Sequence, residues 1–532
     1  MSRARTLSIR TTLRVLSLGG AVALGLCLLG VDKTSRGDTP APFKHPGIVV
    51  TQKQLDLVKA NIAAGAAPWT AAFNAAKTFP SDAGGDPPGK LGYMPHTLSA
   101  SAKTLLNPAV AAGYVLCGSV SDPDVHCTDE KKDGVAAYTQ ALLWYLSPDG
   151  PDKDTYGNTA ISILNAWSPL QDHLGYNAGL QSGWMGTEFA RAAEIMQLNP
   201  NWKPSDISAF KQMMARAFVG RLQLVRPGVA QPGDSAYGQN GNWVLSVADS
   251  MIQIAVLLDD HDLFAQGVAL WRERTPAYCY FAARDGAHPV VPCQTPPYVG
   301  TGSGYATKAS RIADPYGYFG QAGGTSPAKD LPADAGPGAS VPTLFRAPEN
   351  GTSQETCRDL DHVQYGLAAM MNGAETARIQ GVDLYLEQAP RIVACMENAA
   401  FYLDNAVAKG EPTDAAGNGP PYPIPLTKAI TSAVTTDGTL CLAANGKPTL
   451  TLLGTGSLTT FVVEPTWEIG YNEYANRLGM SMPYTSKLVH RYRSMPPDNW
   501  VRATHHIALE MLTHADVFNA GLEDVPAVCG AP

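Results

Sequence analysis

The helical spacing of apolar residues constrains the fold of this chain more than any other feature. From residue 133 onward, apolar side chains recur at i, i+3 and i+4, the pattern of helices with one buried face. We predict helices over Asp133–Leu146, Tyr156–Trp167, Gly186–Met196, Ser205–Val225, Trp243–Leu258, His362–Ile379, Val382–Asn405, about Thr466–Leu478 and Arg502–Leu512. Because the connections differ widely in length, these segments indicate antiparallel helical hairpins and an all-α fold class.

Two long irregular intervals interrupt the helical pattern. Residues Arg284–Asn350 are dense in Gly, Pro, Ser and Thr, and they form either a lid or binding loop or an insertion without order. Gly410–Val463 is the second interval, with a small hairpin expected near its end, at Thr449–Leu453 and Leu458–Val463. No fixed repeat period is visible, which disfavours a solenoid. We therefore expect one domain over residues 45–525 that carries residues 284–350 as a loop insertion.

The N-terminus has the features of an export signal. Four arginines precede the uncharged apolar stretch Val15–Val31. Residues 1–31 are interpreted as a signal peptide or, because no clear cleavage site follows, as an N-terminal anchor, and residues 32–44 as a linker. The expected location is outside the cytoplasm, either periplasmic or secreted.

Eight cysteines follow Cys27, and an even number in an exported protein suggests disulfide bonds. Short separations favour the pairs Cys117–Cys127 and Cys279–Cys293, which leaves Cys357–Cys395 and Cys441–Cys529. Sequence alone allows many other connectivities. Structural zinc is disfavoured, because no Cys-x-x-Cys pair occurs and Cys357 with His362 has no second pair to complete a site. We expect no metal and no other cofactor.

The charge balance and the absent motifs exclude several classes of function. The net charge is -8, and no basic run follows the first 15 residues, which disfavours nucleic acid and anionic membranes as partners. An acidic total still permits a locally positive cleft for a polyanion. The chain contains no Gly-x-Ser-x-Gly elbow, P-loop, dinucleotide fingerprint or His-Glu-x-x-His, which disfavours ester hydrolysis, nucleotide chemistry and zinc proteolysis.

Two clusters of polar residues lie at predicted helix starts. In Tyr237–Trp243 (YGQNGNW), Asn240 or Asn242 either caps the following helix or donates to an anionic substrate at its N-terminus. Glu355–Tyr365 (ETCRDLDHVQY) places Arg358 and His362 four residues apart, on one face of a helix if both are helical. The alternative for this second cluster is ordinary capping and ion pairing. We expect at least two of its residues, which include Glu355, Arg358, Asp359, Asp361, His362 and Tyr365, to be functional.

A third cluster interleaves aromatic and amide side chains. Trp467–Leu478 (WEIGYNEYANRL) suits sugar recognition, because sugars offer apolar faces and many hydroxyl groups, or it is simply a polar helix surface. Its candidate substrate-binding residues are Tyr471, Asn472, Tyr474 and Arg477. His505 and His506 are interpreted as structural or surface residues.

Several segments together resemble the alginate lyase superfamily. They are HPGIVVTQKQLDLVKANIAAGAAPW (His45–Trp69), ILNAWSPLQDHLGYNAGLQSGW (Ile163–Trp184), QNGNW, ETCRDLDHVQYGLAAMMNGAETARIQGVDLY and GYNEYANRLGM (Gly470–Met480). The resemblance covers nearly all of the chain after the signal. It implies an incomplete α/α toroid of helical hairpins around a cleft and cleavage of a 1,4-linked uronic-acid polysaccharide, alginate being favoured and β-1,4-glucuronan the alternative.

The resemblance also implies a β-elimination and roles for individual residues. Asn242, with Asn240 in support, is the candidate that neutralises the substrate carboxylate, and Arg358 could bind the same carboxylate. His362 is the candidate base or carboxylate partner, and Tyr365 the acid or both acid and base. Trp243 and Glu355 are expected to contact substrate. The chain departs from lyases that carry an Asn-His pair in the first cluster, since it reads Asn240-Gly241-Asn242.

Two other classes of function remain open. A glycoside hydrolase would use two carboxylates, which Glu355, Asp359 or Glu468 could supply. A uronan-binding protein without activity would show no turnover. The expected partner in every case is an anionic polysaccharide, and the sequence does not set the oligomeric state.

Overall fold

The computed structural model describes residues 40–78, 89–98, 113–119, 122–224, 241–285, 350–351, 353, 360–407, 466–495, 506 and 509–522. The chain divides into residues 1–41 and residues 42–532, and the second unit holds every element below. The predicted signal or anchor, residues 32–39 of the linker, the interior of the 284–350 insertion and the predicted hairpin near residue 450 lie outside the described residues.

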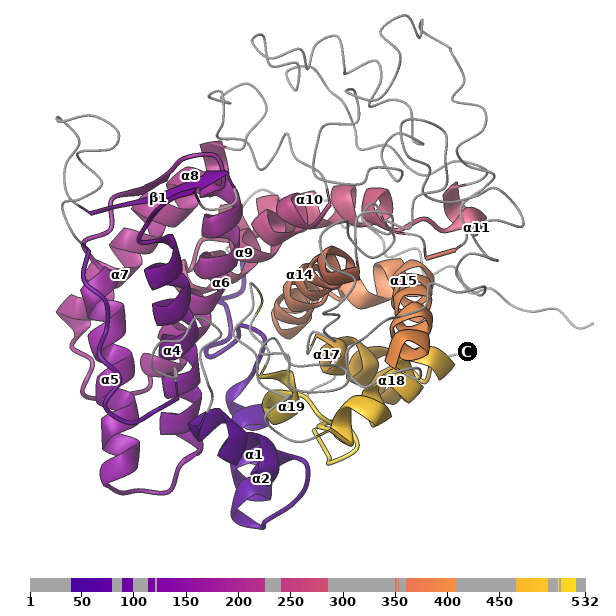
Figure 1. Cartoon of the computed structure of the whole chain (residues 1–532), viewed down its shortest axis with the longest axis horizontal. Helices are drawn as coiled ribbons and strands as arrows, with labels where there is room; N and C mark the ends of the chain where they lie inside the picture. Colours follow the sequence, from indigo (N-terminus) through magenta and orange to yellow (C-terminus); the bar gives the residue numbers. More distant parts are fainter. Residues whose placement is uncertain are drawn as a thin grey trace, which may run out of the picture. The chain divides into compact units, whose positions relative to one another are not determined.

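The described residues of the second unit are mainly helical (Figure 1). The helices before residue 300 are α1 (Gln52–Ala63), α2 (Trp69–Lys77), α4 (Cys127–Leu146), α5 (Pro151–Trp167), α6 (Ala178–Met196), α7 (Pro204–Met213), α8 (Gly220–Leu224), α9 (Asn242–Leu258), α10 (His261–Tyr278) and α11 (Ala282–Asp285). Those after it are α14 (Leu360–Ile379), α15 (Leu384–Val407), α17 (Trp467–Tyr471), α18 (Pro483–Arg493) and α19 (Glu510–Thr513). Two π-helical turns, η1 (Met214–Val219) and η4 (Asn472–Arg477), continue α7 and α17.

Apolar periodicity located most of the long helices, but it missed four. α4, α5, α6, α9, α14, α15 and the α7–η1–α8 run confirm the predicted segments with shifted ends. The missed helices are α1, α2, α10 and α18. α10 buries residues at helical spacing from Leu263 to Tyr278, although Gly267, Arg274, Thr275 and Pro276 interrupt its apolar pattern, and α18 buries only four side chains. The predicted helix Arg502–Leu512 is helical only from Glu510 among its described residues.

Helix contacts run around a ring. α4 packs against α6, α6 against α9, α9 against α14, and α14 against α17. α19 then contacts α17, α1 and α2, and the last two return to α4. α5, α10, α15 and α18 pack on neighbouring members of this ring as the second helices of hairpins (Figure 1). The fold is therefore the expected all-α, incomplete (α/α) toroid.

Short polar contacts close the ring between the two ends of the second unit. Gln54 Nε2 donates to the Thr513 carbonyl oxygen at 2.8 Å, and His514 Nε2 lies 2.9 Å from the carbonyl oxygen of Val49. Because Gln54 and His514 are buried, these contacts satisfy polar groups that would otherwise lose water on folding. The N-terminal segment thus belongs to the domain core.

A small sheet and two disulfide bonds brace the helices. β1 (Tyr114–Ser119) lies between β2 (Asp122–Val125), which is antiparallel to it, and β3 (Asp172–Leu174), which is parallel to it. The bond Cys117–Cys127 confirms the predicted local pair and joins β1 to the start of α4.

The second disulfide corrects the predicted pairing. Cys279 pairs with Cys395, so the predicted pairs Cys279–Cys293 and Cys357–Cys395 are wrong. The prediction relied on short separation along the chain, whereas packing of α10 on α15 brings Cys279 and Cys395 to a Cα–Cα distance of 6.0 Å. Cys441 and Cys529 lie outside the described residues.

Two kinds of feature are absent from the described residues. None of the helices in these ranges is long and apolar enough to span a bilayer. Within the same ranges, no three His, Cys, Asp or Glu side chains are arranged to hold a metal ion.

Candidate active site

Polar side chains of three helices meet inside the ring, between α6, α9 and α14. On α9, Asn242, Ser246, Asp249 and Gln253 recur at helical spacing and are all buried. Gln253 accepts from Arg191 Nε of α6 at 2.9 Å. A buried polar line of this kind is unusual, because burial of polar groups costs free energy unless each finds a partner.

The start of α14 carries the predicted proton-transfer residues. His362 and Tyr365 lie on the first turns of α14, and both side chains are half-buried. Their rings meet edge to face with 5.5 Å between centroids. The structure thus brings the predicted proton-transfer pair together at the N-terminal end of α14.

A third ring completes this group, from a residue that the sequence analysis did not select. His506 is buried, and its ring centroid lies 6.3 Å from that of Tyr365. Its Nε2 lies 3.3 Å from Ser246 Oγ, and that hydroxyl donates to the Asn242 carbonyl oxygen at 2.8 Å. The chain Asn242–Ser246–His506 therefore connects the first cluster to Tyr365. No signal in the linear sequence indicates this, since His506 is far from both clusters.

Ser246 Oγ lies within hydrogen-bond distance of both the Asn242 carbonyl oxygen and His506 Nε2. When the hydroxyl donates to the carbonyl oxygen, Nε2 carries the ring proton of His506 and Nδ1 carries the lone pair. Burial, and after it the charge of Arg191, lowers the pKa of His506 to about 3. The imidazole is therefore neutral at the pH of any ordinary assay.

The first cluster lies at the start of α9, where Asn242 is the first helical residue. Its side chain is fully buried. Trp243 is half-buried and contacts the ring of Tyr176. Asn240, Glu355, Arg358 and Asp359 lie outside the described residues.

The third cluster lies among structural contacts. Tyr474 is fully buried against Tyr385, and the Arg477 guanidinium is paired with Asp383 at 2.9 Å and with Glu473. Asn472 is buried and accepts from Asn476 at 3.1 Å, while Tyr471 Oη lies 3.2 Å from Ser486 Oγ. These contacts hold η4 to its neighbours, and no contact joins the four predicted residues to His362 or Tyr365 in the described structure.

The carboxylates considered for hydrolysis are not arranged as a pair in the described part of the chain. Glu468 is buried and held by the Arg493 guanidinium at 2.6 Å and 2.7 Å. Glu355 and Asp359, its possible partners, lie outside the described residues. Glu468 has the contacts of a structural ion pair.

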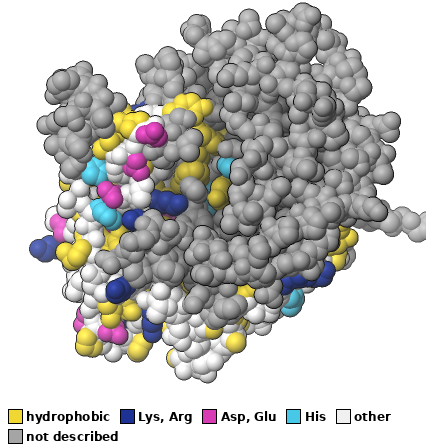
Figure 2. Space-filling model, viewed as in Figure 1, with side chains coloured by type: hydrophobic (Ala, Val, Ile, Leu, Met, Phe, Trp, Pro, Cys, Tyr) yellow, Lys and Arg dark blue, Asp and Glu magenta, His cyan; other side chains and the backbone are white. Residues whose placement is uncertain are grey.

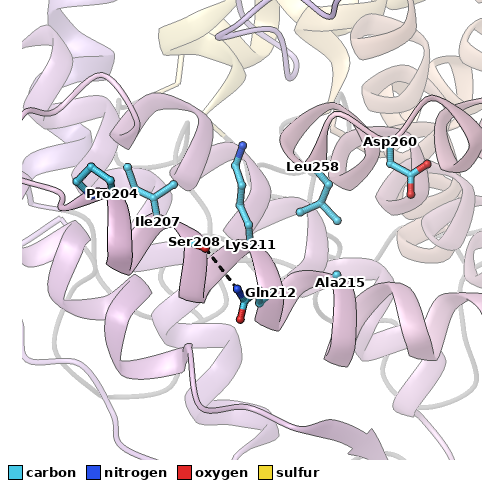
Figure 3. Close-up of a pocket in the computed structure, with 8 residues that line it drawn as sticks. All are labelled: Pro204, Ile207, Ser208, Lys211, Gln212, Ala215, Leu258 and Asp260. Atoms are coloured by element: carbon cyan, nitrogen blue, oxygen red, sulfur yellow. Dashed lines mark hydrogen bonds between the residues drawn. The ribbon is translucent and has the colours of Figure 1, made fainter.

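An open surface depression of about 580 Å³ lies elsewhere, between α7 and the C-terminal end of α9 (Figure 3). Lys211, Leu258 and Asp260 are among its lining residues. Leu258 and Asn242 are at opposite ends of α9, roughly 24 Å apart along the helix axis. The depression is therefore distinct from the group around Tyr365. On the face that Figure 2 shows, basic side chains are scattered among acidic and histidine side chains rather than forming a continuous strip.

Comparisons with known proteins find one matching family and several similar solved structures. Residues 124–287 match the family described as alginate lyase. Similar solved structures include an alginate lyase from Bacteroides ovatus, with 14% identity, TM-score 0.42 and coverage of 69% of this chain and 85% of that one. Two variants of alginate lyase A1-III, each complexed with tetrasaccharide, are also similar. The first shows 15% identity and a TM-score of 0.38, with coverage of 69% of this chain and 82% of that one. The second shows 13% identity and a TM-score of 0.47, with coverage of 90% of this chain and 98% of that one. No curated protein matches the sequence.

The family match includes α4, α5, α6, α9 and α10, and so contains Asn242 and Ser246 of the site. The similarity to the alginate lyase family therefore rests on residues 124–287.

Proposed function

We propose that this protein cleaves a 1,4-linked uronic-acid polysaccharide by β-elimination at the group formed by Tyr365, His362 and His506. The observation that carries the proposal is the position of Tyr365 between two histidine rings, at 5.5 Å and 6.3 Å between centroids. A phenol hydroxyl and imidazole nitrogens are groups that donate and accept protons in catalysis. The family match over residues 124–287 supports the same reaction class.

The proposed reaction moves two protons and breaks one bond. A base removes the C5 proton beside the uronate carboxylate, the C4–O4 bond breaks, a C4=C5 double bond forms, and an acid protonates the departing O4. Charge develops on the carboxylate as the C5 proton leaves. The site must therefore place donors or cations against that carboxylate.

The residues take the following roles in this proposal. Tyr365 protonates O4, and on a substrate whose C5 proton and O4 lie on the same side it also removes the proton. His362 is the base or the partner of the carboxylate. Asn242 with Asn240, and Arg358, are the proposed neutralising groups, and the start of α9 adds favourable backbone N–H groups.

His506 supplies the histidine that the Asn240-Gly241-Asn242 motif lacks. Because its ring is neutral, one ring nitrogen carries a lone pair that can accept a hydrogen bond from Tyr365 or from a protonated substrate carboxyl. It would then polarise the phenol hydroxyl without a charge of its own. Trp243 and Glu355 are retained as proposed substrate contacts.

We propose alginate as the substrate and β-1,4-glucuronan as the alternative, with activity outside the cytoplasm. The two disulfide bonds support export, since such bonds persist in oxidising compartments.

The test is ultraviolet absorbance over time, with purified protein offered polymannuronate, polyguluronate, glucuronan and hyaluronan separately. The conjugated product of elimination absorbs, so a rise with one polymer supports the reaction and names the substrate. New reducing ends without absorbance would mean hydrolysis and contradict the proposal. Absence of both signals with all four polymers would contradict a uronan lyase.

A further inference from the structure

An exposed tyrosine stands beside the proposed site, on the loop between β3 and α6. Tyr176 keeps 46% of its surface exposed, which is unusual for so large an aromatic side chain in this structure. Its ring meets that of Trp243 edge to face, with 6.0 Å between centroids and 75° between planes. Trp243 directly follows Asn242 at the start of α9. The aromatic pair therefore borders the end of α9 where the candidate site lies.

The backbone around Tyr176 is held in one conformation. Gly175 has φ +92°, and a Cβ at that residue would lie 2.4 Å from the Cys117 carbonyl oxygen. Asn177, which follows Tyr176, donates its backbone N–H to the same oxygen at 2.9 Å. Cys117 lies in β1, and its disulfide bond with Cys127 ties that strand to the start of α4. Tyr176 is thus an exposed ring on a braced support, which is the arrangement of a preorganised contact residue.

An exposed ring of this kind matches the chemistry of a sugar. A pyranose presents an apolar face of C–H groups and a rim of hydroxyls, and a tyrosine offers an apolar ring with one polar end. The edge-to-face contact with Trp243 supports the ring of Tyr176 and leaves part of that ring accessible. A polymer that enters the site near α9 would meet this ring beside the sugar that reacts.

We propose that Tyr176, supported by Trp243, forms an aromatic platform that stacks on a sugar ring of the polysaccharide next to the ring that is cleaved. The platform binds the polymer and takes no part in proton transfer. This inference rests on the proposed function for the identity of the polymer. It adds Tyr176, which the sequence did not single out, as a binding residue.

The experiment compares two tyrosines that are both exposed and that each meet another aromatic ring edge to face. Tyr484 on α18 is 44% exposed, and its ring meets Phe401 edge to face at 5.1 Å. Tyr176→Ala should raise KM for the polymer by about 3- to 10-fold, with kcat within twofold, because one aromatic contact is lost. Tyr484→Ala should leave both constants within twofold. Tyr176→Phe restores the ring and should bring KM back toward the unsubstituted value.

A binding measurement separates this inference from the proposed function. Hexasaccharides of mannuronate, guluronate and glucuronate are titrated calorimetrically into the Tyr365→Phe protein, with and without Tyr176→Ala or Tyr484→Ala. Weaker binding with Tyr176→Ala alone supports the platform, whether or not the unsubstituted protein shows elimination. Unchanged binding, equal loss with both substitutions, no binding of any hexasaccharide, or a fall in kcat at constant KM would overturn it. Failure of the proposed function is read separately, from the absorbance test.

Discussion

The N-terminal ends of α9 and α14 and the C-terminal end of α14 both bury polar residues, but these residues are paired loosely at the N-terminal ends and by short ion pairs at the C-terminal end. The helices run parallel, because Ser246 and Tyr365 both contact His506 while, further along, Asp249 accepts a hydrogen bond from Asn372. At the first end, His362, Tyr365 and His506 meet through ring contacts, and His506 Nε2 lies 3.3 Å from Ser246 Oγ. At the other end, polar residues are joined by short ion pairs.

The second end is a closed network of charges. Arg378 pairs with Glu375 at 2.6 Å and with Glu473 at 3.0 Å, and all three side chains are nearly inaccessible. Although burial by itself raises the pKa of Glu375, the charge and hydrogen bond of Arg378 outweigh it and hold that pKa below its ordinary value. His514 lies 3.9 Å from Glu375. Burial raises the pKa of Glu473 to about 8, although the charges of Arg378 and Arg477 oppose the shift. The groups pair with one another as in a structural ion-pair network.

A carboxyl group midway between the ends marks the transition. Burial raises the pKa of Asp249 to about 7, while Arg191 and hydrogen bonds from Gln253 and Asn372 oppose the shift. Its charge is thus less fully compensated than that of Glu375. Along the same two helices, ion pairing weakens toward the start of α9, where the proposed chemistry lies. The comparison teaches that burial and polarity alone do not mark a site, whereas the strength of the polar contacts does.

The strongest test of this comparison is loss of the Tyr365 hydroxyl. Tyr365→Phe should lower kcat by about 10²- to 10⁴-fold, because the proposed acid is lost while the ring contacts with His362 and His506 remain. Initial rates by ultraviolet absorbance measure the effect. Tyr145→Phe is the control, since that hydroxyl bonds Asp56 at 2.7 Å between α4 and α1. Comparable rates for the two variants would remove Tyr365 from the mechanism.

The opposite end should respond in stability. Arg378→Met leaves Glu375 and Glu473 buried without their shared cation and should lower the free energy of unfolding by about 3–5 kcal/mol. Arg272→Met is the matched control, because Arg272 also pairs with a carboxylate, Glu387 at 2.6 Å, but is 47% exposed. Its loss should cost under about 1 kcal/mol. Denaturant unfolding measures the loss of stability in both variants. Equal losses would mean that the pairing of Arg378 with Glu375 and Glu473 does not stabilise the fold more than an exposed ion pair does.

Sequence reasoning found the helices of both ends but could not rank their polar residues. Spacing placed Asn242 and Tyr365 at helix starts, and the family resemblance gave them roles. Arg477 and Tyr474 looked equally suited to substrate, because the sequence shows the residue types and not the partners Asp383 and Tyr385 that they contact. His506 was missed for the complementary reason. Its position beside Tyr365 arises only when the ring of helices closes.

Two buried histidines sharpen the comparison. His506→Ala should lower kcat by about 10- to 100-fold, since Tyr365 loses its neutral neighbour. His514→Ala removes an equally buried ring, whose pKa burial lowers to about 4, from its contacts with Val49 and Thr513. It should cost about 1–3 kcal/mol of stability and leave kcat of the folded protein within twofold. The reverse pattern, with activity lost in His514→Ala and kept in His506→Ala, would break the assignment of the two ends.

The smallest expected effect is a pH dependence of stability at the N-terminal segment. His45 Nδ1 lies 2.9 Å from Glu194, and Nε2 lies 3.0 Å from Asp259, which also has Lys211 at 3.9 Å. The hydrogen bond to Glu194 is the main cause that raises the pKa of His45 to about 9 from 6.5, against the opposing effect of burial. A raised histidine pKa stabilises the fold fully below pH 6.5, and this stabilisation is lost as the pH rises to about 9.

His45→Gln should therefore unfold at a lower temperature than the unsubstituted protein at pH 6, and the difference should shrink by pH 9. Because His45 is a third exposed, solvent screening keeps the expected gain under about 1 kcal/mol. Burial also raises the pKa of Asp249 and of Glu510, to about 7 and about 8, so both proteins lose stability over part of the same range. Only the difference between their melting temperatures isolates His45. A difference that stays constant from pH 6 to pH 9 would mean that the pairing of His45 with Glu194 and Asp259 contributes packing but no charge interaction.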